Sequence, residues 1–291
     1  MKTSVEVIIH PVCLRFSYHN NEIVYMFASN PEQQLDEMEK LMGVGTDQGP
    51  IFDSNVGFLP VASTILIRGE KTILVDPGNY HIGFYSMLKR ALNSKNLTYE
   101  DIDMIVTTHT HSDHINGIDD FRFLNVLMNK DLNMYATKKN IEEINGRFSY
   151  VFEKLSPKAN GFYYKPCLNP IEIEGFFKVK DLEILSFQQD HGFGESTGFR
   201  IKNFAYSSDV FNISPDVFEK LKDLDLWIVD CLRFKPHKSH AHFDKVMEWI
   251  SIIKPKKTIF THMNYEVDYD HINSLCPKNC EAAYDGMVLK V

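Results

Sequence analysis

Three histidines and an aspartate crowd the segment "IVTTHTHSDHING", residues 105–117. The residues before them, 102–108, form a short apolar run of the kind that makes a buried strand. The side chains that follow can bind metal: His109, His111, Asp113 and His114. Imidazole and carboxylate groups suit Zn²⁺, Mn²⁺ or Fe²⁺. Four such ligands are too many for one ion that also keeps an open position, so the spacing predicts two metal ions.

Further ligands for two metals must come from elsewhere in the chain, and strand ends supply them. His191 follows "FQQD", Asp209 ends "AYSSD" and His262 ends "TIFTH". A single histidine at a strand end is usually a hydrogen-bonded core residue, and a histidine cluster can also be a surface patch. Here the order and positions of the three candidates complete two coordination shells, which favours metal binding.

The elements that position these residues alternate along the chain. A hairpin is predicted at 61–76 around "RGEK". Further strands are predicted at 182–190, 197–201, 203–209, 224–230 and 257–262. Helical patterns cover 31–43, 81–94, 137–145, 214–222 and 242–253. Strands early and late with helices between them predict an α/β (α+β) fold, in which sheets pack together with helices outside.

Composition restricts the partners and the setting. Against 39 Asp plus Glu there are 31 Lys plus Arg, a formal charge of −8, so long nucleic acid is not the expected partner. A small anionic substrate in a metal-lined pocket remains compatible with this charge. No eighteen apolar residues run together, and Glu6 and His10 interrupt the N-terminal segment. We therefore expect no membrane segment and a cytoplasmic location.

No internal feature divides the chain. It has no repeat, low-complexity run or Gly/Ser linker, so residues 1–291 are predicted to form a single domain. Five scattered cysteines are poor material for a disulfide framework and are expected to be reduced. "CPKNC" could be half of a metal site, but no second pair lies near it in the sequence.

The chain carries the motif "HTHSDH", followed later by a histidine, an acid and a final histidine. This order resembles the signature of the metallo-β-lactamase fold superfamily of hydrolases. The resemblance implies an αββα sandwich with the site at the mouth between two sheets. Asp76 in "ILVDPG" matches an early aspartate of the superfamily that supports the ligands from behind. Two metal positions sharing one carboxylate are implied: His109, His111 and His191 on one metal, Asp113, His114 and His262 on the other, and Asp209 bridging.

The match narrows downstream of the histidines. The bridging position is occupied by an aspartate, Asp209, whereas the β-lactam-cleaving members of the superfamily usually have a cysteine there. Cleavage of β-lactam antibiotics is therefore not expected. Residues 1–55 are a divergent part, without a recognisable opening strand, glycine turn or small cysteine cluster. Four segments resemble the branch that contains phosphoribosyl 1,2-cyclic phosphate phosphodiesterase: 117–124, 147–153, 197–201 and 236–269.

The expected activity is therefore hydrolysis of a small phosphodiester, with cyclic ones such as a phosphoribosyl cyclic phosphate or a cyclic nucleotide favoured. Two divalent ions, Zn²⁺ or Mn²⁺ with Fe²⁺ as an alternative, lower the pKa of a bridging water toward about 7. Asp113 and His240 are the expected catalytic residues, and the resemblance places His240 over the site as the general acid. His240 is expected to lie at the start of the helix 242–253. The positive end of the helix dipole there would attract phosphate and lower the pKa of His240.

Several assignments remain open at this stage. Arg122 and Arg233 can hold phosphate oxygens in pairs, but each can instead pair with a nearby acid. The aromatic segment 147–166 is compatible with a pocket wall, a lid, a core flap or a dimer contact, and a homodimer is an open alternative. Alternative functions are ester or lactone hydrolysis, RNA processing of the tRNA 3′-end type and a non-enzymatic zinc-binding role.

Overall fold

The computed structural model describes a limited set of residues near the N-terminus and nearly all residues from 96 onward. The described residues are 4–8, 14–19, 22–26, 56–59, 64–68, 72–76, 92–93, 96–179, 182–264, 266–284 and 287–290. The predicted helix 31–43 lies outside them, and of the predicted helix 81–94 only residues 92 and 93 are described, both helical.

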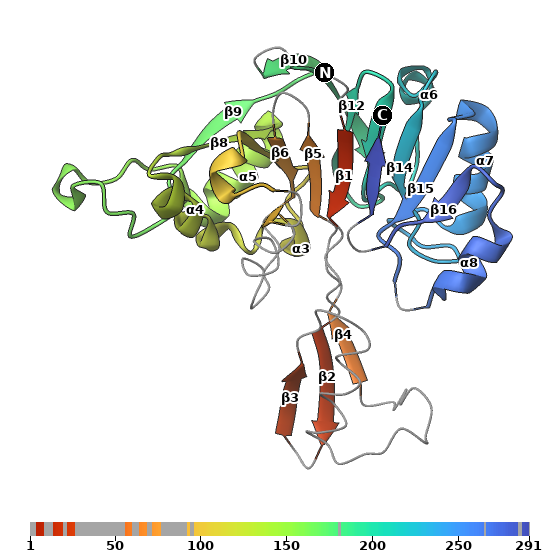
Figure 1. The fold of residues 1–291 in the computed structure, drawn as a ribbon, viewed down its shortest axis with the longest axis horizontal. Coiled ribbons are helices and arrows are strands. Elements are labelled where there is room, and N and C mark those ends of the chain that lie inside the picture. Colours follow the sequence, from red (N-terminus) through yellow and green to blue (C-terminus); the bar gives the residue numbers. More distant parts are fainter. Residues whose placement is uncertain are drawn as a thin grey trace.

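Two seven-stranded sheets face each other, and a three-stranded sheet with the order β3-β2-β4 lies apart from them (Figure 1). The first large sheet has the order β17-β1-β5-β6-β7-β8-β9. Its strands are β1 (Ser4–Ile8), β5 (Thr64–Arg68), β6 (Thr72–Val75), β7 (Met104–Val106), β8 (Leu132–Ala136), β9 (Leu168–Glu172) and β17 (Val288–Lys290). The small sheet consists of β2 (Leu14–His19), β3 (Glu22–Met26) and β4 (Val56–Leu59).

The second large sheet runs in sequence order from β10 to β16. Its strands are β10 (Phe176–Val179), β11 (Leu182–Asp190), β12 (Glu195–Ile201), β13 (Phe204–Ser207), β14 (Leu226–Asp230), β15 (Lys257–Thr261) and β16 (Cys280–Ala282). Strands β6 to β9 are parallel in the first sheet, and β13 to β16 are parallel in the second. The residues that follow such strands therefore collect at one edge of each sheet.

Helices cover the outer faces of both sheets (Figure 1). The α-helices are α3 (Ser112–Ile115), α4 (Phe121–Met128), α5 (Lys138–Phe148), α6 (Pro215–Lys220), α7 (Phe243–Ile253) and α8 (Tyr269–Leu275). Short 3₁₀ turns cover Tyr99–Asp101, Ile118–Asp120, Ser149–Val151 and Pro157–Ala159. The arrangement confirms the predicted αββα sandwich.

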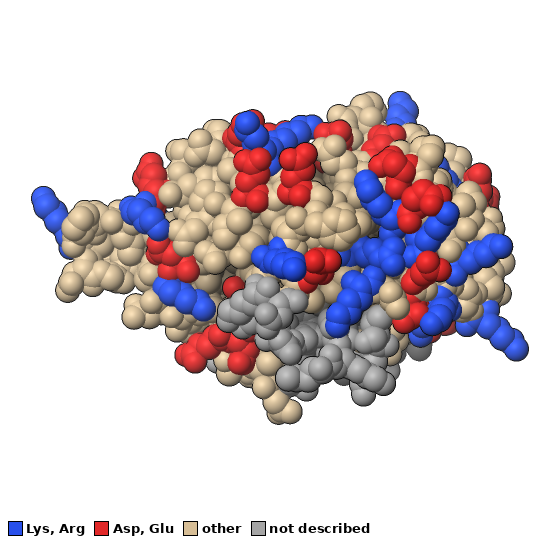
Figure 2. All heavy atoms as spheres, turned by 90° about the horizontal axis from the view of Figure 1, so that it is seen from above, with Lys and Arg blue, Asp and Glu red and all other residues tan. Residues whose placement is uncertain are grey.

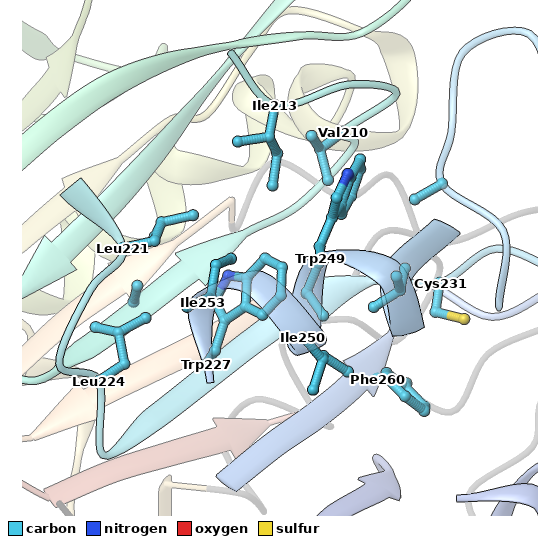
Figure 3. Close-up of a cluster of buried hydrophobic side chains, with 14 of the residues drawn as sticks. Val210, Ile213, Leu221, Leu224, Trp227, Cys231, Trp249, Ile250, Ile253 and Phe260 are labelled. Carbon is cyan, nitrogen blue, oxygen red and sulfur yellow. The ribbon is translucent and has the colours of Figure 1, made fainter. Parts of the chain in front are cut away.

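Strand alternation explains how the layers are held together. Met104 and Val106 of β7 point into the core between the sheets, whereas Ile105 points to the cluster beneath α4. Trp227 of β14 points outward and packs with Trp249 of α7, with ring centroids 6.4 Å apart (Figure 3). Both faces of these strands are buried, which is why their sequences read as nearly continuous apolar runs.

The hairpin β5–β6 and the first strand β1 bear on two predictions from the sequence. The hairpin at 61–76 is confirmed by the antiparallel pairing of β5 with β6. The statement that no opening strand can be recognised in the first 55 residues is wrong, because β1 pairs with β5 and with the C-terminal β17. The partners of β1 lie about sixty and nearly three hundred residues away, so no local pattern could reveal this pairing.

The aromatic segment 147–166 divides in two. Phe148, Tyr150 and Phe152 pack against the cluster beneath α4, so the first half is a flap of the core. In the second half Phe162 is 70% exposed.

On the face of the molecule drawn in Figure 2, acidic and basic side chains are interspersed.

Candidate metal centre

The segment that follows β7 is tied to both sheets before it reaches its metal-binding side chains. Thr107 donates its N–H to Tyr135 of β8, which continues the ladder by one residue. At Thr108 the N–H donates to Asp76 Oδ1 (2.8 Å), and the carbonyl accepts the N–H of Thr197 from the other sheet (2.9 Å). The chain then turns into α3. As a result His109, at the start of this turn, is only 2% exposed.

Asp209, which follows β13, lies at the centre of the site with its two oxygens facing different histidines. Oδ2 lies 3.5 Å from His109 Nε2 and 3.6 Å from His191 Nε2. Oδ1 lies 3.5 Å from His114 Nε2 and 3.3 Å from His262 Nε2. The carboxylate thus has one oxygen for each of two groups, which is the geometry a bridging ligand needs.

The structure brings all seven of the sequence-predicted ligands together. They form two groups that share Asp209, which we call position 1 and position 2. Within each group the potential ligand atoms lie within 4.8 Å of one another. Position 1 consists of His109, His111, His191 and Asp209, and position 2 of Asp113, His114, His262 and Asp209.

Three of the acidic and histidine residues at this edge have left-handed backbone conformations. The φ angles are 48° at Asp76, 50° at Asp209 and 59° at His262. Asp76 and His262 directly follow strands β6 and β15, and Asp209 comes two residues after the last residue of β13. Positive φ is uncommon in residues other than glycine and costs on the order of 1–3 kcal/mol. Such strain concentrates at functional sites because it aims a side chain away from the course of its strand.

The donors in this cluster fit divalent metal ions. Nε2 of His109, His114 and His262 is buried and has no hydrogen-bond partner in the described part of the chain. Buried polar atoms are rarely left in this state unless a further group satisfies them. An ion between the imidazoles and the Asp209 carboxylate would do so with ligand types that Zn²⁺ and Mn²⁺ accept.

The charge states of the cluster agree with this fit. Burial lowers the pKa of His109, and the neighbouring His114 adds to the effect, so the ring is neutral as a ligand must be. Although burial opposes ionisation of Asp209, His262, His114 and His109 hold its pKa well below the ordinary value. At His114 burial is outweighed by Asp209 and Asp76, which raise the pKa, so a cation there competes with a proton.

Hydrogen bonds at the opposite ring nitrogens fix the ligand histidines. The Nδ1 of His114 donates to Asp76 Oδ2 (3.0 Å), and Asp76 also accepts the Thr108 hydroxyl (2.6 Å). Asp76 thus contacts His114, a candidate ligand of position 2, from behind, and its role in supporting a metal ligand stays a prediction. His191 Nδ1 donates to the Ser239 carbonyl (2.6 Å). Such contacts set the tautomer, so that Nε2 carries the lone pair that faces the cluster.

His240 lies beside the cluster and is supported by an aspartate that sequence reasoning missed. Its Nδ1 lies 2.8 Å from Asp230 Oδ2, and its Nε2 lies 4.0 Å from Asp209 Oδ2. Asp230 is fully buried, and its other oxygen lies 4.0 Å from His262 Nδ1. The available signal was the aspartate ending the strand segment "LDLWIVD", the same pattern that identified Asp209.

The expected lowering of the His240 pKa is wrong. Helix α7 begins at Phe243 with His242 as its N-cap, so His240 precedes the helix instead of starting it. Burial alone would lower the pKa of His240, but the hydrogen bond to Asp230 and the charges of Asp230, Asp209 and Asp113 raise it. A carboxylate at 2.8 Å outweighs a helix terminus further along the chain.

The two candidate arginines lie outside the cluster. Arg122 is exposed on α4, with its guanidinium 5.0 Å from the ring centre of Phe123. Arg233 pairs with Glu266 (3.2 Å) and donates to the Pro236 carbonyl (3.0 Å). Pairing with an acid was the alternative that the sequence left open for Arg233. Contact with phosphate stays a prediction for both.

The turn after His191 fits closely against the loop that carries His240. Gly192 has a φ of +77°, and a Cβ added there would meet the Lys238 carbonyl oxygen at 2.2 Å and Ser239 Cα at 2.8 Å. Both are backbone atoms, so Gly192→Ala must push the loop away and disturb the His191–Ser239 hydrogen bond. We expect turnover to fall about a hundredfold, the typical effect of a misplacement of about 1 Å.

Gly194→Ala on the same turn is the matched control. A Cβ at Gly194 meets nothing within 4 Å, so this variant should keep its turnover. Steady-state kinetics on both variants, with the same substrate, provides the comparison. Equal rates in the two variants would show that the fit of Gly192 against the loop does not position His240.

The αββα sandwich, with histidine and aspartate side chains that could hold metal gathered where its strands end, has the form of a metallo-β-lactamase fold. Residues 71–263, more than half of the chain, match the family model described as "Beta-lactamase superfamily domain". The chain belongs to this superfamily, whose members are hydrolases that hold divalent metal ions. No helix in the described part is long and apolar enough to cross a membrane.

Comparison with individual proteins adds detail. The chain is 28% identical over 193 residues to a Porphyromonas gingivalis protein named octanoyltransferase, covering 65% of this chain but only 38% of that protein. A structure described as a new diphosphatase from the PhnP family matches 100% of this chain and 98% of its own, with a TM-score of 0.71 and 21% identity. The short form of human tRNase Z matches 78% of this chain and 92% of its own, with a TM-score of 0.55 and 17% identity.

Proposed function

We propose that the chain is a dinuclear metal-dependent phosphodiesterase acting on a small anionic, preferably cyclic, phosphodiester such as a phosphoribosyl cyclic phosphate or a cyclic nucleotide. The observation that carries the proposal is the place of His240. It is a proton donor held by Asp230, with its Nε2 4.0 Å from the carboxylate shared by positions 1 and 2. An anionic substrate on two cations would therefore meet a third group able to carry positive charge.

The residues divide the work as follows. Positions 1 and 2 would each hold one ion, Zn²⁺ or Mn²⁺, which would supply Lewis acidity and lower the pKa of water toward about 7. Asp209 and Asp113 provide carboxylate oxygens, and the five histidines of positions 1 and 2 complete the two sets of ligands. The carboxylate of Asp209, with one oxygen facing each group of histidines, would hold both ions.

His240 acts on the leaving oxygen. The attacking water first gives a proton to solvent. As its oxygen bonds to phosphorus and the bond from phosphorus to the leaving oxygen breaks, Nε2–H of His240 gives its proton to that oxygen and is protonated again from solvent. Asp230 accepts the hydrogen bond from Nδ1 throughout, which orients the ring and stabilises its protonated form. Burial opposes the charge on His240, but the hydrogen bond to Asp230 outweighs it and raises the pKa of His240, the direction that a proton donor needs. Opening a cyclic phosphodiester needs this proton because its leaving group is a poor one.

A second candidate is hydrolysis of a carboxylic ester or lactone. What favours it is the similarity to a protein whose name describes octanoyl transfer, although the chain matches only 38% of that protein. Attack on a carbonyl makes the same demands on the metals and on a proton donor. The two functions differ in whether the centre must bind an anion.

A phosphodiester and a carboxylic ester that both release p-nitrophenolate distinguish the two candidate functions. The metal-stripped protein is reloaded with Zn²⁺ or Mn²⁺ and given bis(p-nitrophenyl) phosphate, p-nitrophenyl octanoate, a lactone and 2′,3′-cyclic nucleotides. The proposal expects turnover of the phosphodiesters at least about a hundredfold above that of the carboxylic esters. If the octanoate or the lactone is cleaved while the phosphodiesters stay intact, the second candidate replaces the first. A tRNA precursor with a 3′ extension serves as a test of RNA processing.

A further inference from the structure

Thr110 lies between two ligands of position 1, His109 and His111, and is held by an arginine on α5. Arg147 Nη1 donates to the Thr110 carbonyl (2.6 Å), and Nη2 donates to Thr110 Oγ1 (3.0 Å). The Thr110 hydroxyl in turn donates to Glu143. One guanidinium therefore fixes both the backbone and the side chain of the residue that separates the two ligands.

The Arg147–Glu143 pair by itself explains little of this arrangement. The two residues are one helical turn apart with Nη2 3.2 Å from Oε2, and their side chains are 46% and 40% exposed. Exposed pairs at this spacing contribute only about 0.3–0.5 kcal/mol. The guanidinium, however, reaches past its own helix to a buried threonine. Its orientation thus links α5 to the metal-binding turn.

The ligand that depends most on this link is His111. The rings of His109 and His191 are held by hydrogen bonds at Nδ1, to Thr108 Oγ1 (3.0 Å) and to the Ser239 carbonyl. For the ring of His111 the described contacts are with other proposed ligands: its Nδ1 lies 3.1 Å from His191 Nε2, and its ring lies 4.6 Å from that of His109. Its carbonyl accepts the N–H groups of His114 and Ile115 at the start of α3. The His111 ring is therefore placed by the backbone on its two sides, at Thr110, which Arg147 holds, and at the first turn of α3.

Position 2 is supported by other groups. Asp76 holds His114, and Asp230 lies beside His262, while the described contacts of Arg147 are with Thr110 and Glu143. We propose that Arg147 is a positioning residue that sets the metal affinity of position 1 and leaves that of position 2 unchanged. The inference rests on the metal centre of the proposed function, but it does not depend on which substrate is cleaved.

The test measures metal binding at each position separately. His262→Ala removes a ligand of position 2, and His191→Ala removes a ligand of position 1. Zn²⁺ affinity of the full chain is measured by competition with a chromogenic chelator, with and without Arg147→Met. We expect Arg147→Met to weaken binding about 10- to 100-fold in the His262→Ala background, the usual effect of losing a supporting contact. In the His191→Ala background the change should stay within about twofold.

Controls keep the result specific. Arg200 also donates to backbone carbonyls, those of Lys202 and Lys220, and contacts none of the proposed ligands in the described part of the chain. Arg200→Met should therefore leave both affinities unchanged. Arg147→Lys, which keeps the charge but loses the two-point contact, should fall between Arg147→Met and the parent protein.

A second measurement uses the chain with all its ligands, in case a background variant folds poorly. After dialysis against a weak chelator, Arg147→Met should retain one ion where the parent protein retains two. Equal weakening at both positions, or at neither, would overturn the inference. Failure to cleave phosphodiesters with both affinities as expected would instead count against the proposed function alone.

Discussion

Asp209→Asn is expected to lower phosphodiester turnover by more than about a hundredfold and to reduce the tightly bound metal to one ion or none. The amide keeps the size of the side chain but loses the charge and one of the two oxygens that face opposite histidine groups. Losing even a supporting contact behind a ligand typically costs 10- to 100-fold, and loss of a shared ligand should cost more. Steady-state kinetics and metal analysis on the same preparation measure both effects.

Asp119→Asn is a matched control for Asp209→Asn. Asp119 lies just after the metal-binding segment and accepts a hydrogen bond from the hydroxyl of Tyr150 (2.7 Å). Asp119→Asn removes a charge of the same sign without touching a ligand. It should keep two ions and nearly full turnover. An Asp209→Asn protein that behaves like Asp119→Asn would show that the shared carboxylate does not link two metals.

His240→Asn should affect substrates according to their leaving groups. For a cyclic or alkyl phosphodiester, whose leaving oxygen needs a proton, we expect turnover to fall about 10²- to 10⁴-fold. For bis(p-nitrophenyl) phosphate, whose leaving group departs readily as an anion, the loss should stay below about tenfold, because little proton transfer is left to catalyse. Turnover numbers for both substrates, measured on one enzyme preparation, give the ratio directly.

Asp230→Asn tests the same step from one residue further away. It leaves the imidazole of His240 in place but removes the carboxylate 2.8 Å from Nδ1. The losses should follow the same order of substrates, with a smaller effect than His240→Asn. If His240→Asn slowed both substrates equally, its role would be binding or structural, and the assignment as proton donor would be wrong.

The sandwich, and the gathering of the seven candidate ligands at one site, could be predicted because each depends on local pattern. A short apolar strand followed by histidines and an acid carries its signal within a few residues, as at His109 and at Asp209. The helices at 137–145, 214–222 and 242–253 were predicted to within about three residues, since apolar spacing and caps determine them. The resemblance to a known family then ordered the ligands into two groups.

What the sequence could not show depends on which segments pack together in space. Asp230 looks like any strand-ending aspartate until the loop carrying His240 folds back onto it. Arg147 reads as an exposed helical residue paired with Glu143, and only the fold brings Thr110 within its reach. The place of Gly192 against Lys238 is likewise a contact between distant segments. The pKa of His240 was misjudged for the same reason.

Phosphodiester turnover as a function of added metal shows whether two ions act together. The metal-stripped full chain is titrated with Mn²⁺ or Zn²⁺, and the initial rate of bis(p-nitrophenyl) phosphate hydrolysis is measured at each ratio of metal to protein. We expect no turnover without metal, little at one equivalent and a maximum at two. Full turnover at one equivalent, or turnover by the stripped protein, would contradict a centre in which two ions act together.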